Sequence, residues 1–498
     1  MAHHNEFMLR QIPPSLSSSR ATTNLLLQLT EMNKNHQDQV AQVSVAVKRH
    51  FVKRTPFKIY HGSTNSTRTL TFKKSEMVDV SDFDQILSID NVTRTVIVET
   101  NVPMDKLVSE TLKYGLVSPV VPEFPGITVG GAIQGAAGES SSFKWGFFSQ
   151  TINWVEMVLA DGSVIVCSPS QNSDLFYGAA GASGTLGIIT AAEILLVPAK
   201  RYVNLSYVAV KSFDEANSQL LSLGRAERDF IDCIMFGPDH GLIIIGNMSD
   251  EATGKLRKFT RAIDEWYYLH VAKVDAGQRP LNDSLPLIDY LFRYDRGAFW
   301  VGRFAFERFG VVFNRLTRFV LDPLLHTREL YKALQDSGAS QEHIVQDLTV
   351  PLNKAGDFMK YIDQRTGIYP LWICPIKPEP RSPLMCNSIE TELAINVGIW
   401  GPRISIYEDF ITLNRDLEIK LTEMSGKKWL YAHSYYTKDE FWKIYDKTWY
   451  DKLRLKYHAT TLPDIYDKTY VKDRVSVNAK RGLLNTIFGK ARLKIREQ

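Results

Sequence analysis

Cysteine is scarce in this sequence. The 498 residues contain four cysteines, Cys167, Cys233, Cys374 and Cys386, and no two of them form a CxxC pair. The spacing argues against a zinc cluster or a dense disulfide framework, and no metal site is predicted. Such sparse use of cysteine favours a reducing compartment.

Long apolar runs are also missing. No stretch approaches the roughly 18–20 apolar residues that span a bilayer, and the N-terminal MAHHNEFMLRQIPPSLSSSR has no apolar core of a secretory signal. We therefore expect a soluble protein that is not secreted. It would be cytoplasmic or bound peripherally to an intracellular membrane. The net charge is only +4, from 59 basic and 55 acidic residues, and no basic stripe alternates with aromatics, so no nucleic-acid partner is expected.

The length and a change in composition predict several domains. A chain of this length forms two or three domains, and glycine becomes rarer in the second part of the sequence. We predict a flexible N-terminal arm (1–35), an α+β unit (36–200), a second domain (201–425), an aromatic-rich segment that packs back on the core (426–479), and a basic tail (480–498).

Hydrophobic periodicity predicts individual elements within these parts. Helical spacing follows Pro103 and ends near Gly115, and two apolar runs flank Asp161-Gly162 as in a β-hairpin. In TELAINVGIW (391–400), apolar residues alternate with polar or small ones. This pattern predicts a half-buried strand with a polar face.

The basic tail allows two interpretations. Between its lysines and arginines lie apolar residues: Leu483, Leu484, Ile487, Phe488 and Leu493. A basic amphipathic helix can lie on an anionic membrane surface, so peripheral membrane contact through residues 480–498 is one interpretation. A solvated terminal helix or a frayed end is the other.

Three turns rich in small residues lie within one part of the sequence, each next to a predicted strand. They are HGSTNS (61–66), TVGGAIQGAAGESSSFKWG (128–146) and GASGTLGIIT (181–190). Successive backbone N–H groups of such turns can bind phosphate oxygens, and glycine allows a ligand to approach the backbone closely. The GxGxxG and P-loop fingerprints are absent. Ordinary turns explain each stretch singly, but one long ligand explains all three together.

These residues carry a family resemblance. HGSTNS, then VVPEFPGITVGGAIQGAAGESSSFKWG, then VEMVLADGSVIVCSPSQNSDLFYGAAGASGTLGIITAAEILLVPAK resemble the FAD-binding domain of the vanillyl-alcohol-oxidase superfamily. Within it, the sequence is similar to the delta-24 sterol reductases, also called the diminuto or seladin family. The resemblance continues through FRYDRGAFW, HIVQDLTVP, IYPLWICPI, TELAINVGIWG and LYAHSYYTKDEFWKIYD, and so extends over most of the chain.

The resemblance implies a fold and a cofactor. The fold would be α+β, with a two-subdomain PCMH-type FAD-binding domain and an α+β cap domain that holds the substrate. FAD would lie between the subdomains, with its pyrophosphate at residues 61–66. The implied cofactor-binding residues are His61, Gly62, Ser63, Thr64, Asn65, Ser66, Thr128, Val129, Gly130, Gly131, Gly135, Gly138, Glu139, Ser141, Ser142, Trp145, Gly146, Gly184, Gly187, Ile188 and Ile189. Many relatives attach FAD through a histidine where this sequence has Asn65, so non-covalent FAD is expected.

The resemblance also implies a reaction. It is the reduction of an isolated carbon–carbon double bond in a sterol-like or other isoprenoid lipid, with hydride from NADPH or NADH passing through flavin N5. Such a reaction needs a proton donor. The candidates are Tyr431, His433 and Tyr435, which would share one face of a strand, together with Glu392 and Lys144. Aromatic residues of the second domain would line an apolar cavity or simply form its core: Phe299, Trp300, Tyr369, Trp372 and Trp400.

Two other functions remain open from the sequence. One is a flavin oxidase or desaturase of a lipophilic metabolite that uses oxygen. The other is a flavoprotein that acts as a non-redox cyclase or binding protein. The sequence also departs from the family pattern, because Phe143 replaces a histidine of the SSSHKYG motif and the PEL segment reads PEF, followed by Pro125 and Gly126. The family's N-terminal membrane segment has no counterpart in this sequence. These departures suggest that the substrate differs while the scaffold is kept.

Overall fold

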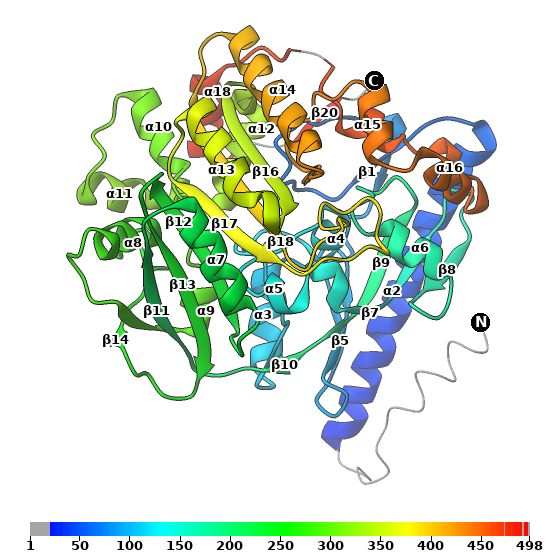
Figure 1. The fold of residues 1–498 in the computed structure, drawn as a ribbon. Helices are drawn as coiled ribbons and strands as arrows, with labels where there is room; N and C mark the ends of the chain where they lie inside the picture. Colours follow the sequence, from blue (N-terminus) through cyan, green and yellow to red (C-terminus); the bar gives the residue numbers. More distant parts are fainter. Residues whose placement is uncertain (1–19, 473, 491–492, 497–498) are drawn as a thin grey trace.

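A long helix, α2 (Arg20–Lys53), is the first element of the computed structural model, which describes residues 20–472, 474–490 and 493–496. It lies along the side of the first domain (Figure 1, dark blue) and buries Val40, Val43 and Val47, whose spacing defines one helical face. The arm predicted for 1–35 is therefore wrong for residues 20–35, where LLLQLTEM supplies strong helix formers. Residues 1–19 lie outside the described part of the chain.

The first domain is built around a five-stranded antiparallel sheet. Its strand order is β4 (Ile86–Asp90), β5 (Thr95–Glu99), β9 (Ile188–Leu195), β7 (Ile152–Val158) and β8 (Val164–Cys167). The predicted hairpin is confirmed, because β7 pairs with β8 and Gly162 takes a positive φ of 87° in the turn. The predicted helix after Pro103 is also confirmed as α3 (Met104–Leu112).

Short strands and helices complete this domain. The remaining elements are β1 (Lys58–Tyr60), β2 (Thr71–Lys73), η1 (Lys74–Glu76), β3 (Met77–Asp79), β6 (Leu116–Val117), α4 (Val129–Gln134), α5 (Ser142–Trp145), η2 (Phe148–Thr151), α6 (Ser173–Ala179) and β10 (Val197–Pro198). β1 pairs with β3 in parallel, and β6 pairs with β10. The HGSTNS turn therefore begins directly after a short strand.

The second domain contains a nine-stranded sheet. Its order is β14 (Lys255–Leu256), β15 (Asn282–Pro286), β11 (Tyr202–Val210), β13 (His240–Ser249), β12 (Phe230–Gly237), β17 (Leu371–Ile376), β18 (Ala394–Arg403), β16 (His343–Pro351) and β19 (Lys427–Lys428). All neighbours are antiparallel except β14 and β15. Mixed helix and sheet in both domains agree with the predicted α+β class (Figure 1).

Helices cover one face of the large sheet, and the first domain covers much of the other. The covering helices are α7 (Phe213–Gly224), α13 (Leu352–Thr366) and α14 (Tyr407–Glu423) (Figure 1). On β18, Ile395 and Val397 point toward these helices. Asn396, on the opposite face, is equally buried. The alternation of this strand is as predicted, but the prediction that the strand is half-buried is wrong, because the face that carries Asn396 is buried as well.

Further helices surround the open part of the sheet. They are α8 (Tyr267–Asp275), α9 (Leu287–Leu291), α10 (Gly302–Phe309), α11 (Arg315–Leu321), η3 (Asp322–Leu324), α12 (Thr327–Ser337) and η4 (Ala339–Glu342). No helix of the described residues is both long and apolar enough to cross a membrane.

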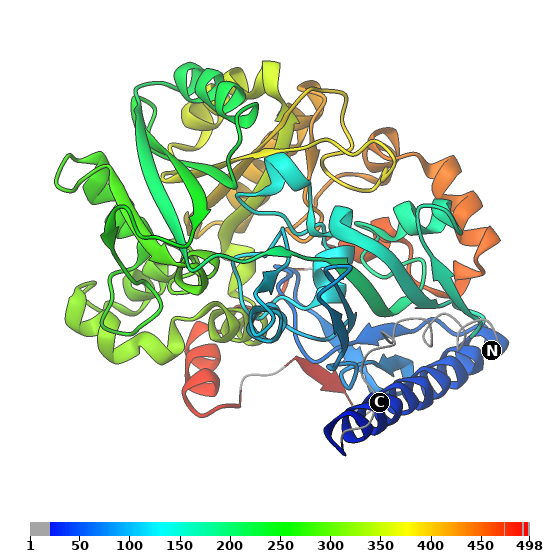
Figure 2. The same ribbon diagram turned by 90° about the horizontal axis from the view of Figure 1, so that it is seen from below.

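The C-terminal segment returns to the first domain. Its elements are α15 (Lys438–Ile444), α16 (Lys447–Lys456), η5 (Ala459–Thr461), α17 (Ile465–Thr469), α18 (Ala479–Ile487) and β20 (Lys494–Arg496). On α16, the Tyr450 hydroxyl bonds Thr185 Oγ1 at 2.7 Å. α18 packs on α12, and β20 adds to β2 in parallel. Figure 2 shows α18 in red beside the yellow-green helices.

One buried histidine fastens α2 to the first sheet. His36 bonds Glu99 at 2.7 Å and Glu156 at 2.9 Å, and these glutamates come from β5 and β7. Burial lowers the pKa of His36, but the bonds and charges of the two carboxylates outweigh burial and raise it to about 9. Because the folded pKa exceeds the ordinary value of 6.5, His36 stabilises the fold fully below pH 6.5 and loses this effect as pH rises through 9.

We expect His36→Gln to destabilise the protein by about 1–3 kcal/mol at pH 6 and by much less at pH 10. The measurement is the urea midpoint of both proteins across this range. His50→Gln is the control, because His50 lies on the same helix and bonds only Thr55 near the surface. A loss from His36→Gln that is equally large at both ends of the range would contradict the prediction.

Candidate functional site

A cavity of about 1220 Å³ lies between the two domains. Its wall has three sources. The first domain supplies the loop after β1 and the start of α4, and the second domain supplies parts of β16, β18 and α10–α12. The C-terminal part supplies residues within 467–472, residues 474 and 475, and α18. The cavity therefore forms only where segments distant in sequence meet.

The HGSTNS turn lies on this wall as predicted. His61, Ser63, Thr64, Asn65 and Ser66 line the cavity, and Gly62 gives the turn its positive φ of 82°. The end of the turn is attached to the segment around Tyr431. The Ser66 hydroxyl and the Thr67 N–H donate to the Tyr431 carbonyl at 3.0 and 3.2 Å.

Two cations that were not predicted stand beside this turn. Arg68 donates to the carbonyls of Leu430 and Ala432, and Lys468 donates to the carbonyl of Ser183. Burial lowers the pKa of Arg68 to about 10 and, together with the charge of Arg68, that of Lys468 to about 8. Arg68 lies two residues after the HGSTNS motif, so its position in the sequence could have indicated a role in ligand binding. The sequence around Lys468 contains no comparable signal.

These groups fit the pyrophosphate of FAD. Among the described residues, neither Arg68 nor Lys468 forms an ion pair with a carboxylate, although both line the cavity. In the same part of the chain, His61 Nδ1, Arg68 Nε and Thr69 Oγ1 are buried without a hydrogen-bond partner. Buried polar groups normally have partners, and an unpaired buried charge is costly. An anionic ligand at this turn would satisfy both the charges and the unpaired atoms.

The second predicted loop reaches the cavity with its first half. Thr128, Gly130, Gly131, Gly135 and Gly138 all line it. Neighbouring residues lie so close to these glycines that a side chain would collide with them, whether or not a ligand is bound. A Cβ on Gly130 would lie 2.9 Å from Thr100 Cβ, and one on Gly138 would lie 2.3 Å from Phe147. Gly184, Ile188 and Ile189 of the third loop line the cavity too.

The second half of that loop turns away from the cavity. The predicted cofactor residues that do not line it are Val129, Glu139, Ser141, Ser142, Trp145, Gly146 and Gly187. Residues 139–146 instead join the two domains: the carbonyl of Ser140 accepts from Ile231 N–H at 2.7 Å, and that of Ser142 accepts from Lys377 N–H at 2.9 Å. The predicted cofactor contact therefore finds no support for Val129, Glu139, Ser141, Ser142, Trp145, Gly146 and Gly187, because none of them lines the cavity.

Phe143 belongs to this interdomain segment. Its side chain is buried in the core between the large sheet and the helices α7, α13 and α14, and it does not line the cavity. This departure from the family pattern therefore lies away from the cavity wall. Phe143 affects how α5 packs on the second domain.

A buried acid, Asp347 on β16, forms the chemical centre of the cavity wall. Its Oδ2 accepts from the Tyr431 hydroxyl at 2.5 Å, and its Oδ1 accepts from Asn396 Nδ2 at 2.8 Å. Burial raises the pKa of Asp347 to about 6, against the opposing effect of these hydrogen bonds. Burial and the Asp347 charge also raise the pKa of Tyr431. Asp347 was not predicted, because HIVQDLTVP reads only as an apolar strand.

A second acid, Glu123, lines the cavity from the first domain. It follows Pro122 in the VPEF segment, is 6% exposed, and its Oε1 has no hydrogen-bond partner among the described residues. Burial and the nearby charge of Glu139 raise its pKa well above the usual range. These effects favour the protonated, neutral form of Glu123.

The predicted proton donors separate into two groups. Tyr431 and His433 line the cavity, but Tyr435 does not and packs toward α14, because residues 429–436 form no regular strand that would align all three. Burial lowers the pKa of His433 to about 3, so its ring is neutral.

The remaining two donors are wrong predictions. Glu392 is exposed and ion-paired with Arg225 at 2.7 Å. Lys144 lies 3.4 Å from Asp229 near the surface, with its charge above the Trp145 ring. Neither side chain lines the cavity.

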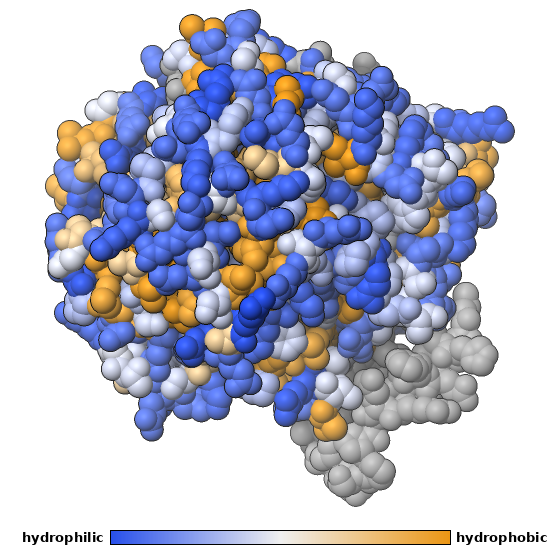
Figure 3. All heavy atoms as spheres, viewed as in Figure 1, coloured by the Kyte–Doolittle hydropathy of each residue, from blue (hydrophilic) through white to orange (hydrophobic). Residues whose placement is uncertain are grey.

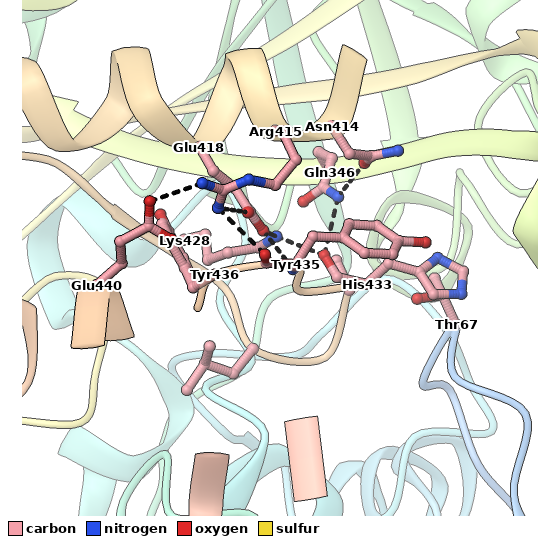
Figure 4. Close-up of polar contacts among 12 residues, drawn as sticks. Thr67, Gln346, Asn414, Arg415, Glu418, Lys428, His433, Tyr435, Tyr436 and Glu440 are labelled. Atoms are coloured by element: carbon pink, nitrogen blue, oxygen red, sulfur yellow. Dashed lines mark hydrogen bonds and ion pairs between the residues drawn. The ribbon is translucent and has the colours of Figure 1, made fainter. Parts of the chain in front are cut away.

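A buried polar network holds the segment that carries Tyr431 and His433. Lys428 Nζ donates to Glu418 at 2.7 Å and to the His433 carbonyl. Glu418 also accepts from Tyr435 N–H at 2.9 Å, and Gln346 donates to the His433 carbonyl at 3.0 Å. Figure 4 shows Glu418 descending from α14 to meet Lys428. The network fixes the backbone on both sides of the cavity-lining residues.

Aromatic and aliphatic side chains make up much of the remaining wall. Of the predicted aromatics, Phe299, Trp372 and Trp400 line the cavity, while Trp300 and Tyr369 do not. Phe299 and Trp400 are 4.4 Å apart between ring centroids. Aliphatic residues from α10 to α12 join them: Leu321, Leu324, Leu325, Leu330 and Leu334. This part of the wall suits an apolar ligand.

Comparisons with known proteins agree with this geometry. A family model described as FAD binding domain matches residues 33–168. Delta(24)-sterol reductase of Homo sapiens is 33% identical over 416 residues, which cover 81% of this chain and 80% of the relative. The Caenorhabditis elegans homolog of that enzyme is 30% identical, with 81% of each chain covered, and the Pisum sativum enzyme is 30% identical, with 80% and 78% covered. The chain therefore belongs to the Delta(24)-sterol reductase family and is an FAD-dependent oxidoreductase.

Proposed function

We propose that the protein reduces an isolated carbon–carbon double bond in a sterol or similar isoprenoid lipid, with FAD as cofactor and NADPH or NADH as electron donor. The observation that carries the proposal is the cavity. One part of its wall is cationic and rich in hydroxyl groups, another is aromatic and aliphatic, and a buried acid lies on the same wall. The names of the relatives support the sterol class of substrate.

The protein's own groups would bind the cofactor without a covalent bond. Bound FAD supplies the hydride chemistry, while the protein supplies binding, orientation and electrostatics. Arg68, Lys468 and the backbone of residues 61–66 would hold the pyrophosphate. Asn65 lines the cavity at the family's histidine position, and its amide cannot form the histidyl link.

Tyr431 is the best-supported proton donor. Its hydroxyl lies on the cavity wall and is bonded to Asp347 Oδ2. When Asp347 is protonated, the carboxyl donates to the Tyr431 oxygen, so that the Tyr431 proton is free for a substrate carbon and is then replaced from Asp347 Oδ2. Asn396 holds the other carboxyl oxygen and thereby fixes the orientation of the carboxyl group. His433 is poorly suited to this role. Its pKa is lowered to about 3, so its ring is neutral and lacks the extra proton that a cationic imidazole would donate.

Anaerobic mixing with NADPH and with NADH tests the proposed function. We expect one of them to bleach the flavin absorbance rapidly, and a sterol with an isolated side-chain double bond to restore it. Reduction of the flavin by a lipid substrate instead would indicate an oxidase or desaturase. No reduction by either would favour a cyclase or a binding protein.

Acid precipitation tests the mode of flavin attachment. We expect the yellow colour to stay in the supernatant, because Asn65 offers no ring nitrogen for a bond to the flavin. A coloured pellet after washing in denaturant would contradict non-covalent binding.

Tyr431→Phe tests the proton donor. We expect it to slow the oxidation of reduced flavin by the lipid substrate by about 10²–10⁴-fold, the usual contribution of a positioned acid, while flavin reduction by the nicotinamide is unchanged. Tyr435→Phe is the matched control, because it removes a hydroxyl that does not line the cavity. An unchanged rate in Tyr431→Phe, with the loss appearing in Glu123→Gln instead, would assign the role to Glu123.

The pH profile tests the part played by Asp347. Because its pKa is about 6, the carboxyl holds its proton below that value and loses it as pH rises. We therefore expect the rate of the same half-reaction to fall above about pH 6 in the wild type, and to be low and independent of pH in Asp347→Asn. A wild-type rate that rises through this range would contradict the relay.

A further inference from the structure

Exposed apolar side chains gather at one edge of the cavity. On α11 and the loop before it, Val312, Leu316, Phe319 and Val320 are exposed, Val312 at 70% and Leu316 at 69%. At the end of α18, Leu484, Ile487 and Phe488 are exposed as well. We call these seven residues the docking face. Part of it is visible in Figure 3 as apolar surface over α10 and α11.

The two parts of the docking face belong to one continuous surface. α11 leads through η3 into α12, and α18 packs on α12. Asn485 of α18 donates to Asp336 of α12 at 2.7 Å, and a Cβ on Gly482 would lie 2.6 Å from Ser337 Cβ. In Figure 2, the red helix α18 lies directly beside these yellow-green helices.

The docking face surrounds an edge of the cavity. Val311 and Leu321, at the two ends of the α11 segment, line the cavity, and so do Leu483 and Ile487 of α18. Val311 and Ile487 are also solvent-exposed. These side chains therefore contact both the interior of the cavity and the outer surface, as residues at an entrance do.

The two stretches that carry the docking face contain charges of one sign. Residues 310–321 contain Arg315 and Arg318, and residues 474–490 contain Arg474, Lys480, Arg481 and Lys490, with no aspartate or glutamate in either stretch. The neighbouring carboxylates Asp322 and Asp336 are ion-paired with Arg296 and Arg481. Apolar side chains on stretches with a net positive charge match an anionic lipid surface. A second copy of this chain fits poorly, because a symmetric contact would bring the same cations together.

We propose that the docking face binds the surface of an anionic lipid bilayer and brings the cavity entrance against it. Binding to the bilayer is independent of the reaction that the protein catalyses. The passage of a lipophilic substrate through this entrance, in contrast, rests on the proposed function. The site differs from the one that the sequence alone suggested. In residues 480–498, Leu483 lines the cavity, and α11 with the loop before it supplies four of the seven exposed apolar residues.

Vesicle sedimentation tests the proposal with the full-length, flavin-loaded protein. The probes are phosphatidylcholine vesicles with and without phosphatidylserine. We expect the wild type to bind the anionic vesicles, and Leu316→Ser/Phe319→Ser/Phe488→Ser to bind them at least about tenfold more weakly, because each apolar side chain contributes to insertion. Arg315→Gln/Lys480→Gln should lose much of the preference for phosphatidylserine.

Matched controls separate docking from general effects. Val92→Ser/Leu455→Ser removes two exposed apolar side chains far from the docking face in sequence, and should bind like the wild type. Flavin absorbance and thermal midpoint verify that every variant is folded. Equal binding by the triple variant and the control, or no binding by the wild type, would overturn the proposal. A wild-type dimer that the triple variant converts to a monomer would assign the face to a second copy.

Substrate delivery distinguishes a failure of docking from a failure of the proposed function. With a sterol carried on cyclodextrin, the triple variant should react at the wild-type rate, and with the sterol in anionic vesicles it should be about tenfold slower. If neither protein reduces any sterol, the proposed function fails while the sedimentation result still decides docking. Equal rates from vesicles for both proteins would overturn entry through this face.

Discussion

The buried ion pair between Lys428 and Glu418 is the constraint on which the site depends. It fixes the segment 428–436, since Lys428 also donates to the His433 carbonyl and Glu418 accepts from Tyr435 N–H. The same segment anchors the flavin turn, because the Tyr431 carbonyl accepts from residues 66 and 67. Removing one partner of such a buried pair typically costs about 3–5 kcal/mol. One short, irregular segment thus sets the position of Tyr431, the proposed proton donor, relative to both the HGSTNS turn and the second domain.

The cations and the acids of the cavity wall lie in different electrostatic environments. Arg68 and Lys468 have no carboxylate partner among the described residues, which leaves their charges available to an anionic ligand. Asp347 and Glu123 are buried away from water, and burial raises the pKa of both carboxyl groups and so favours their neutral form. A carboxyl group that holds its proton near neutral pH can take part in proton transfer. Under the proposed function, the cations of this cavity serve binding and its buried acids serve proton transfer.

The sequence allowed local features to be predicted, but not which of them meet. The hairpin at Gly162 and helix α3 follow from periodicity and turn chemistry, and the small-residue turns on the cavity wall follow from the family resemblance. Asp347 could not be found, because its role depends on Asn396 and Tyr431, which reach it from another strand and from an irregular segment. Tyr435 and Glu392 were misplaced for the same reason: the alternation of a strand gives its two faces, but only tertiary packing decides which one meets the cavity.

The last part of the chain connects entrance, cofactor loop and second domain. α18 rests on α12 at the docking face, and β20 pairs with β2, whose Thr71 and Phe72 line the cavity. Helix and strand are only marginal when isolated, so each owes its stability to the surface on which it packs. The C-terminal segment thus packs both on α12, beside the docking face, and on β2, which contributes to the cavity wall near the HGSTNS turn.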